Sequence, residues 1–288
     1  MIKGRLAPCS IVVAMFGAIP MSATAQQADK ELGWFLTAEF AAVWTGGNSE
    51  SNTLGLGATL RRVWQRSELR FDAKAIRTES SLKTRTAVGT PSDFDVVVDE
   101  RTETTANNTN VRGRYDYNIS ERFFLFGGAD WLRDRPAGIE SRFLMVAGAG
   151  NVWVDNDRVR FKTDYGAAYT FQDDVIANPF IKTNFPGIRV SYDFGWTVSV
   201  STEFTSELIG DWNLDNTDDV RLDFTNSLPV AITGALSLKP SLKLAWRNEP
   251  SLTEVGVVAP GGTPTGETVL VPLEKLDTFF TLALVVKF

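Results

Sequence analysis

Apolar side chains occupy every second position at the end of the chain, from Phe280 through Leu282, Leu284 and Val286 to Phe288. Smaller or more polar residues lie between them. A period of two predicts a β-strand with one face in an apolar environment. The same alternation recurs along most of the chain, and it is clearest over residues 159–171, where apolar and aromatic side chains alternate with charged residues or glycine.

The alternation predicts twelve strands. They cover about residues 34–45, 52–65, 69–75, 111–117, 123–131, 143–153, 159–171, 188–194, 196–208, 220–228, 236–246 and a last segment that ends at 288. After the second, fourth, sixth, eighth and tenth strands the predicted connections are short. The other connections are mostly longer, with the two longest over residues 79–103 and 248–275. Short turns that alternate with longer loops are typical of outer-membrane barrels.

A soluble sandwich of two sheets alternates too, but two features favour a barrel. Charged residues occupy the less apolar face of most strands, and tryptophans lie near strand ends, where an aromatic girdle places its rings. The predicted lumen-lining residues are Arg112, Arg114, Arg158, Arg160, Lys162, Arg189, Glu203, Arg221, Asp223 and Lys243. The predicted girdle is Trp34, Trp44, Trp64, Trp131, Trp153, Trp196 and Trp246. We therefore predict an all-β fold, a transmembrane antiparallel up-and-down β-barrel of about twelve strands with both termini in the periplasm.

The first 25 residues read as a secretory signal peptide. Basic Lys3 and Arg5 precede an apolar stretch, and Ala23-x-Ala25 supplies a small-x-small cleavage site. We expect cleavage between Ala25 and Gln26, which leaves residues 26–288 as the barrel. After residue 25 no uninterrupted apolar run approaches the roughly 20 residues that a spanning helix needs, so the membrane prediction rests on the alternating strands.

Composition narrows the chemistry. The chain has no histidine, and its one cysteine lies in the predicted signal segment. The predicted mature chain therefore lacks the residues for nucleophilic catalysis by a Ser–His pair or by a cysteine. We expect that it is not an enzyme and that it binds no cofactor. The net charge is −6, which argues against nucleic acid as a partner.

Acidic residues also cluster in the predicted loops. The pairs Asp173–Asp174 and Asp218–Asp219 are interpreted as solvated loop charge, because an acid–base pair needs a pocket that separates the two pKa values. Nearby oxygen ligands for a hard cation come from Asp211, Asn213, Asp215 and Asn216. The glycine turn and closing glutamate of a dedicated calcium loop are missing, so no metal site is predicted.

Several segments resemble the YdiY-like family of salt-induced outer-membrane proteins, a family of undefined biochemical role. They are TGGNS at 45–49 with LGLG at 54–57, YDYNISERFFLFG at 115–127, DR at 134–135 with GIESR at 138–142, and the final strand from 277 to 288. That strand, ending in Phe288, also resembles the sorting signal of outer-membrane barrels. The resemblance implies an outer-membrane barrel with a link to salt stress, and it supplies no catalytic residues.

Two functions stay open from the sequence. The first is a narrow channel or solute-passage barrel that favours anions, because the segments 111–117 and 159–171 are rich in cations. The alternative is a closed structural or adhesive barrel that acts through the two long loops. The expected partners are outer-membrane lipids, lipopolysaccharide and, through the last strand, the barrel-assembly machinery.

Overall fold

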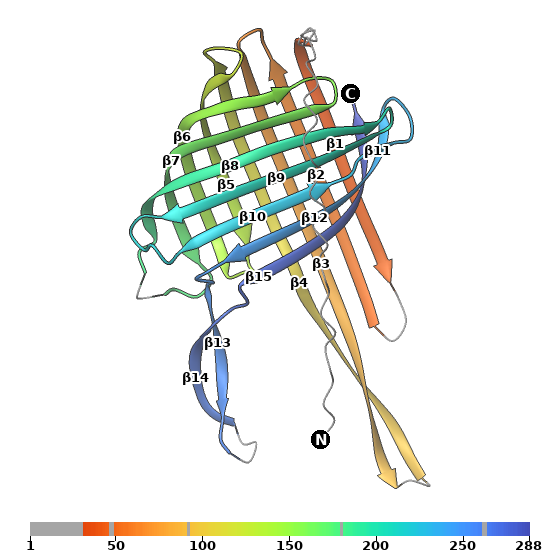
Figure 1. The fold of residues 1–288 in the computed structure, drawn as a ribbon. Helices are drawn as coiled ribbons and strands as arrows, with labels where there is room; N and C mark the ends of the chain where they lie inside the picture. Colours follow the sequence, from red (N-terminus) through yellow and green to blue (C-terminus); the bar gives the residue numbers. More distant parts are fainter. Residues whose placement is uncertain (1–30, 46–48, 91–92, 179–180, 261–263) are drawn as a thin grey trace, which may run out of the picture.

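A computed structural model describes residues 31–45, 49–90, 93–178, 181–260 and 264–288, and the predicted signal segment with its Ala25–Gln26 junction lies outside them. The described chain is all-β (Figure 1). The strands are β1 (Gly33–Thr45), β2 (Ser49–Val63), β3 (Ser67–Thr90), β4 (Asp93–Asn118), β5 (Phe123–Asp134), β6 (Ile139–Asp155), β7 (Val159–Asp174), β8 (Asn184–Ser199), β9 (Thr202–Asn213), β10 (Val220–Ser227), β11 (Val230–Ala231), β12 (Leu236–Arg247), β13 (Leu252–Val258), β14 (Pro264–Pro272) and β15 (Leu276–Lys287). No helix in these ranges is long and apolar enough to cross a membrane.

Twelve strands close into a barrel. Each of β1 to β9 pairs antiparallel with the next, β10 pairs with β12, β12 with β15, and β15 with β1. The two-residue β11 pairs with β9 and β12 beside this ring. The closing seam is short: β1 meets β15 only between Thr37–Phe40 and Leu284–Lys287. The predicted fold class and strand number are confirmed.

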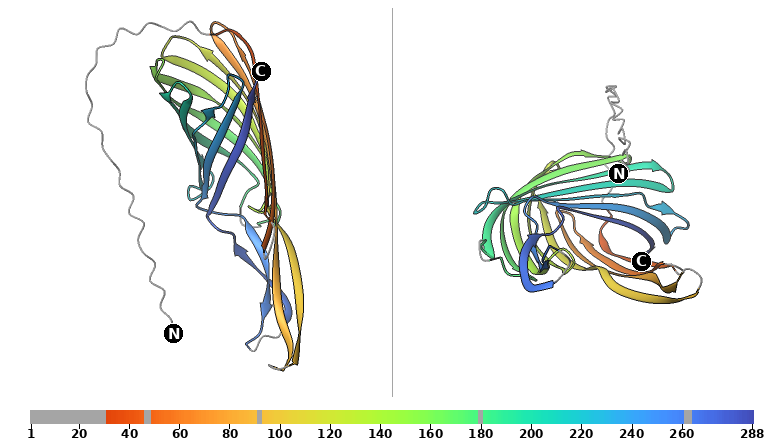
Figure 2. Two further views of the ribbon diagram at one scale, coloured as in Figure 1. Left: turned by 90° about the vertical axis from the view of Figure 1, so that its right-hand side faces the viewer. Right: turned by 90° about the horizontal axis from the view of Figure 1, so that it is seen from below.

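The two ends of the barrel differ. The backbone N–H of Phe288 donates to the Leu36 carbonyl, so the last residue and the start of β1 share one end, which we call the terminal end. The connections at this end are short, for example residues 64–66 and 156–158. At the opposite end, the loop end, two hairpins project beyond the barrel (Figure 2).

Both hairpins occupy segments that the sequence interpretation treats as loops. The segment 79–103 continues β3 and β4 as one paired ribbon, which ends at Thr90 opposite Asp93. Within 248–275, β13 and β14 form a separate two-stranded sheet. Alternation reveals a strand only where one face meets an apolar environment. A ribbon outside the barrel needs only backbone hydrogen bonds and β-branched residues, so the pattern does not reveal it.

The wall follows the predicted alternation. On β1, Trp34, Leu36 and Phe40 face outward with large exposed fractions, while Glu39 and Ala41 face the lumen. The buried side chains of this strand therefore face the lumen rather than a space between two sheets. Strands β1 to β5 form one wall, and β6 to β10, β12 and β15 cross it obliquely on the other side (Figure 1).

Candidate functional site in the barrel lumen

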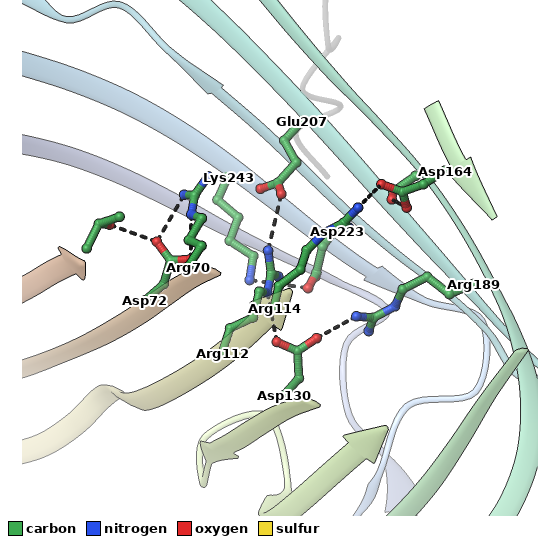
Figure 3. A network of polar contacts seen from close by, with 12 residues as sticks. Arg70, Asp72, Arg112, Arg114, Asp130, Asp164, Arg189, Glu207, Asp223 and Lys243 are labelled. Atoms are coloured by element: carbon green, nitrogen blue, oxygen red, sulfur yellow. Dashed lines mark hydrogen bonds and ion pairs between the residues drawn. The ribbon is translucent and has the colours of Figure 1, made fainter. Parts of the chain in front are cut away.

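Charged side chains from opposite walls meet in the middle of the lumen. Arg112 on β4 contacts Asp130 on β5 through Nε at 2.7 Å and Glu207 on β9 through Nη1 at 3.2 Å. Arg189 on β8 reaches the second oxygen of Asp130 at 2.5 Å. Asp130 is therefore shared between two arginines, and the arrangement joins strands that lie far apart around the ring (Figure 3).

Further contacts hold these groups in place. Arg189 also donates two hydrogen bonds to Asp211, at 2.7 and 2.8 Å. Arg70 forms a similar two-point contact with Asp72, at 2.7 and 2.9 Å, and Thr59 donates a hydrogen bond to the same carboxylate. Bidentate contacts of this kind fix the planar guanidinium as well as attract it. We call the set Arg70, Asp72, Arg112, Asp130, Arg189 and Glu207 the ion-paired belt.

The belt separates two cavities, and all six of its residues line both. The cavity toward the loop end, the loop-side chamber, has a volume of about 250 Å³. The cavity toward the terminal end, the terminal-side chamber, has a volume of about 70 Å³. The lumen is thus two unequal spaces in series rather than one open tube.

The loop-side chamber carries an excess of bases. Five acidic residues line it: Glu39, Asp72, Asp130, Glu207 and Asp223. Seven basic residues line it: Arg70, Lys74, Arg112, Arg142, Arg189, Lys239 and Lys243. Lys239 contacts Glu39 at 2.5 Å and Lys243 contacts Asp223 at 3.4 Å.

The terminal-side chamber has the opposite balance. Seven acidic residues line it: Glu68, Asp72, Asp116, Asp130, Asp164, Asp193 and Glu207. The basic residues number five: Arg70, Arg112, Arg114, Lys162 and Arg189. Because the belt contributes three charges of each sign, the opposite surpluses come from residues on either side of it.

Aromatic rings narrow the terminal side as well. Phe124 and Phe126 point inward from β5 and are almost fully buried. The Arg114 guanidinium lies 4.1 Å from the centre of the Phe126 ring, and it contacts Asp116 at 2.7 Å and Asp164 at 2.8 Å. Gly150 on β6 leaves room for this packing, because a Cβ there would lie 2.2 Å from the Phe124 ring.

The structure distributes the predicted lumen residues unevenly. Arg112 and Arg189 belong to the belt, Arg114 and Lys162 line the terminal-side chamber, and Asp223 and Lys243 line the loop-side chamber. Since Arg112 and Arg114 each contact two carboxylates, they leave no free positive charge. The cation surplus therefore lies in the loop-side chamber and not, as the sequence suggests, along 111–117 and 159–171.

The remaining predicted lumen residues lie nearer the two openings. Arg221 contacts Asp219 at 2.6 Å and lines a separate cavity of about 140 Å³ among the loops. Arg160 contacts Asp193 at 3.2 Å, and Arg160 and Glu203 both lie beside Gly195. Arg158 is exposed in the turn before β7.

Asp130 and Arg142 both line the lumen but are absent from the sequence prediction. Both fall at the inward positions of their strands. Asp130 precedes Trp131 and Arg142 precedes Phe143, and these two aromatic residues pair in register on the outer face. The alternation alone could have placed both residues in the lumen, but not their partners.

The tryptophans lie near strand ends, as the sequence suggests. Trp34, Trp64, Trp153 and Trp196 are near the terminal end and exposed. Toward the loop end are Trp131, Trp246 and a further exposed tryptophan, Trp212, which is not among the predicted girdle residues. Trp44 lies in β1 near the loop end.

The oxygen ligands considered for a cation have other partners. Asp211 binds Arg189 and Asp215 binds Lys182. Asn213 accepts backbone hydrogen bonds from Asp215 and Asn216. Among the described residues, no group of three or more acidic, histidine or cysteine side chains could hold a metal ion.

Comparisons with known proteins agree with the resemblance found in the sequence. A family model described as "Protein of unknown function, DUF481" matches residues 38–255. The "Uncharacterized protein YdiY" of Escherichia coli (strain K12) is 26% identical over 138 residues, which cover 48% of this chain and 52% of that protein. The chain thus spans about half the length of the curated relative that it matches.

Similar solved structures are also barrels, at low identity. The COG4313 outer membrane channel from Pseudomonas putida F1 is 11% identical with a TM-score of 0.43, over 93% of this chain and 100% of that one. The translocator domain of autotransporter NalP from Neisseria meningitidis is 9% identical with a TM-score of 0.44, over 90% and 89% of the two chains. An anion-selective porin from Comamonas acidovorans is 9% identical with a TM-score of 0.38, over 90% and 100%.

Proposed function

The chain belongs to the family described as "Protein of unknown function, DUF481", and from that premise we propose that the barrel is a narrow, non-enzymatic outer-membrane channel that admits small anions at its loop end. The observation that carries the proposal is the loop-side chamber, where seven basic residues face five acidic ones. A cleft lined with one sign of charge concentrates the opposite ion from solution. The belt then makes the passage narrow.

The orientation follows the usual topology of such barrels. Short turns face the periplasm and longer loops face outward, which places the loop-side chamber at the external surface. Outer-membrane lipids and lipopolysaccharide would surround the apolar outer wall. Export by a signal peptide cleaved at Ala25–Gln26, and assembly through β15 and Phe288, belong to the same proposal. A role under salt or osmotic stress rests on the family resemblance alone.

Conductance tests the proposal directly. The chain lacking residues 1–25 would be refolded, inserted into a planar bilayer and recorded in asymmetric KCl. Small discrete current steps are the expected result, because the belt leaves only a constricted path. A barrel that is folded, as shown by its heat-modifiable migration on gels, but carries no current would exclude the channel.

A second function is favoured by one specific observation. The Arg112–Glu207 and Arg189–Asp130 contacts join opposite walls of the lumen, as a permanent internal brace would. The barrel would then be closed, and the β3–β4 ribbon and the β13–β14 hairpin would act at the surface. A silent barrel whose binding to cells or surfaces disappears when residues 79–103 are shortened would support this alternative.

A further inference from the structure

Two basic side chains of the loop-side chamber, those of Lys74 on β3 and Arg142 on β6, have neither a hydrogen bond nor an ion pair with any residue that the structure describes. Every other base that lines the chamber contacts a carboxylate: Arg70, Arg112, Arg189, Lys239 and Lys243. Lys74 and Arg142 therefore account for the surplus positive charge of the chamber.

Charges of both signs surround these two residues. Arg221 and Arg247 repel Arg142, which Asp223 and Asp211 attract. Lys239 repels Lys74, which Glu39, Asp72 and Glu207 attract. Each of these acids already contacts another base. The pairs are Asp223–Lys243, Asp211–Arg189, Glu39–Lys239, Asp72–Arg70 and Glu207–Arg112. Lys74 is exposed to the chamber and Arg142 is half-buried, so an anion that enters this space can contact both charges, and neither has a carboxylate in direct contact.

The chamber also offers apolar surface beside these cations. Leu132 on β5 pairs in register with Arg142, and Leu144 follows Arg142 by two positions on the same face of β6. Both leucines line the chamber and are buried. Ile76 has the same relation to Lys74 on β3. A chloride or phosphate ion makes no use of such surface, whereas an organic anion does.

We propose that the loop-side chamber binds a small organic carboxylate. The carboxylate lies on the Arg142 guanidinium, whose planar fork matches its two oxygens. The apolar body of the ligand lies against Leu132 and Leu144, and Lys74 adds to the attracting field. The chamber volume of about 250 Å³ is just below the usual range for ligand pockets, which begins at about 300 Å³, so the ligand is about as large as a single substituted ring.

This proposal rests on the proposed function only in requiring that solutes enter at the loop end. Its test is equilibrium binding, which needs no current. Benzoate would be titrated into the folded barrel in detergent and followed by calorimetry, with acetate and benzylamine as probes that lack the ring or reverse the charge. Saturable benzoate binding that is tighter than binding of either control is expected.

Variants assign the site. Arg142→Gln should weaken benzoate binding about tenfold or more, because charge-assisted hydrogen bonds contribute about 1.5–3 kcal/mol. Arg142→Lys should lie between this variant and the unmodified chain, since it keeps the charge but loses the fork. The matched control is Lys162→Gln, which removes one positive charge from the terminal-side chamber and should leave benzoate affinity unchanged.

Other outcomes would overturn the site. One is that benzoate binds no more tightly than acetate. The other is that Arg142→Gln and Lys162→Gln lose equal amounts of benzoate affinity. If Arg142→Gln does not fold, Leu144→Ala takes its place, and it should weaken benzoate but not acetate. A barrel that binds benzoate yet carries no current would exclude the channel and leave the site intact, so the two failures are distinguishable.

Discussion

The two chambers of the lumen are built from the same kinds of residue but have opposite character. The loop-side chamber is larger, has more bases than acids and leaves Lys74 and Arg142 without partners among the described residues. The terminal-side chamber is smaller, has more acids than bases and lies beside the buried Phe124 and Phe126 rings. The number of charges on a strand therefore says little about the electrostatic field in the lumen. The pairing across the ring decides which charges remain free.

The largest expected effect comes from the boundary between the chambers. Asp130→Ala removes the carboxylate that Arg112 and Arg189 share, so that each guanidinium keeps only its second carboxylate, Glu207 or Asp211. Breaking an enclosed ion pair on one side typically destabilises by about 3–5 kcal/mol, and we expect the lower end here because lumen water screens the charges. Urea unfolding of the barrel in lipid vesicles would measure it.

The same variant also tests whether the belt restricts the passage of ions. If the belt is the constriction, Asp130→Ala should also raise single-channel conductance, because the two chambers merge. Unchanged stability together with unchanged conductance would mean that the belt is neither a brace nor a constriction.

The second-largest effect is expected for the aromatic packing, which occurs only on the terminal side of the lumen. Phe126→Ala removes a buried ring that lies under Arg114. A loss of about 3 kcal/mol in unfolding free energy is expected, as for other buried Phe→Ala changes. Leu125→Ala is the matched control, since its side chain faces outward and is half-exposed. Similar losses for the two variants would show that the lumen is not packed at this level.

The opposite surpluses predict an electrical asymmetry. Ions of opposite sign accumulate in two chambers in series, so current should be larger at one polarity than at the other. Changing Lys74 and Arg142 together to Glu reverses the loop-side surplus. We expect the preference for chloride over potassium to fall by about tenfold, the lower end of what charged clefts do to local ion concentration. Current–voltage curves measure both effects, and a symmetric curve for the unmodified barrel would contradict them.

The smallest effect is expected for the loosest pair of the loop-side chamber. Lys243 and Asp223 lie 3.4 Å apart, and each side chain is about one-third exposed. Asp223→Asn should therefore change the unfolding free energy by less than about 1 kcal/mol, as exposed ion pairs do. An effect as large as that of Asp130→Ala would show that the chamber excludes water far more than its exposure indicates.

The fold could be predicted from the sequence because each wall residue faces one of two environments. The alternation determines the number of strands and which residues face inward. It is sufficient to place Asp130 and Arg142 in the lumen as well. The partners could not be predicted, since Arg112 meets Glu207 across 95 residues of chain. That contact depends on the curvature of the barrel and the stagger of its strands, and the hydrophobic pattern of a single strand contains no information about either. The β3–β4 ribbon could not be predicted for a different reason. Outside the barrel no apolar environment requires its side chains to alternate.

The short seam between β1 and β15 also has a mechanical consequence. Along the ring, β1 pairs with β2 from Gly33 to Thr45, but it joins β15 only between Thr37–Phe40 and Leu284–Lys287. A closed ring under strain parts where the fewest backbone hydrogen bonds must break together. The β1–β15 pair can therefore separate before any other pair of neighbouring strands in the wall.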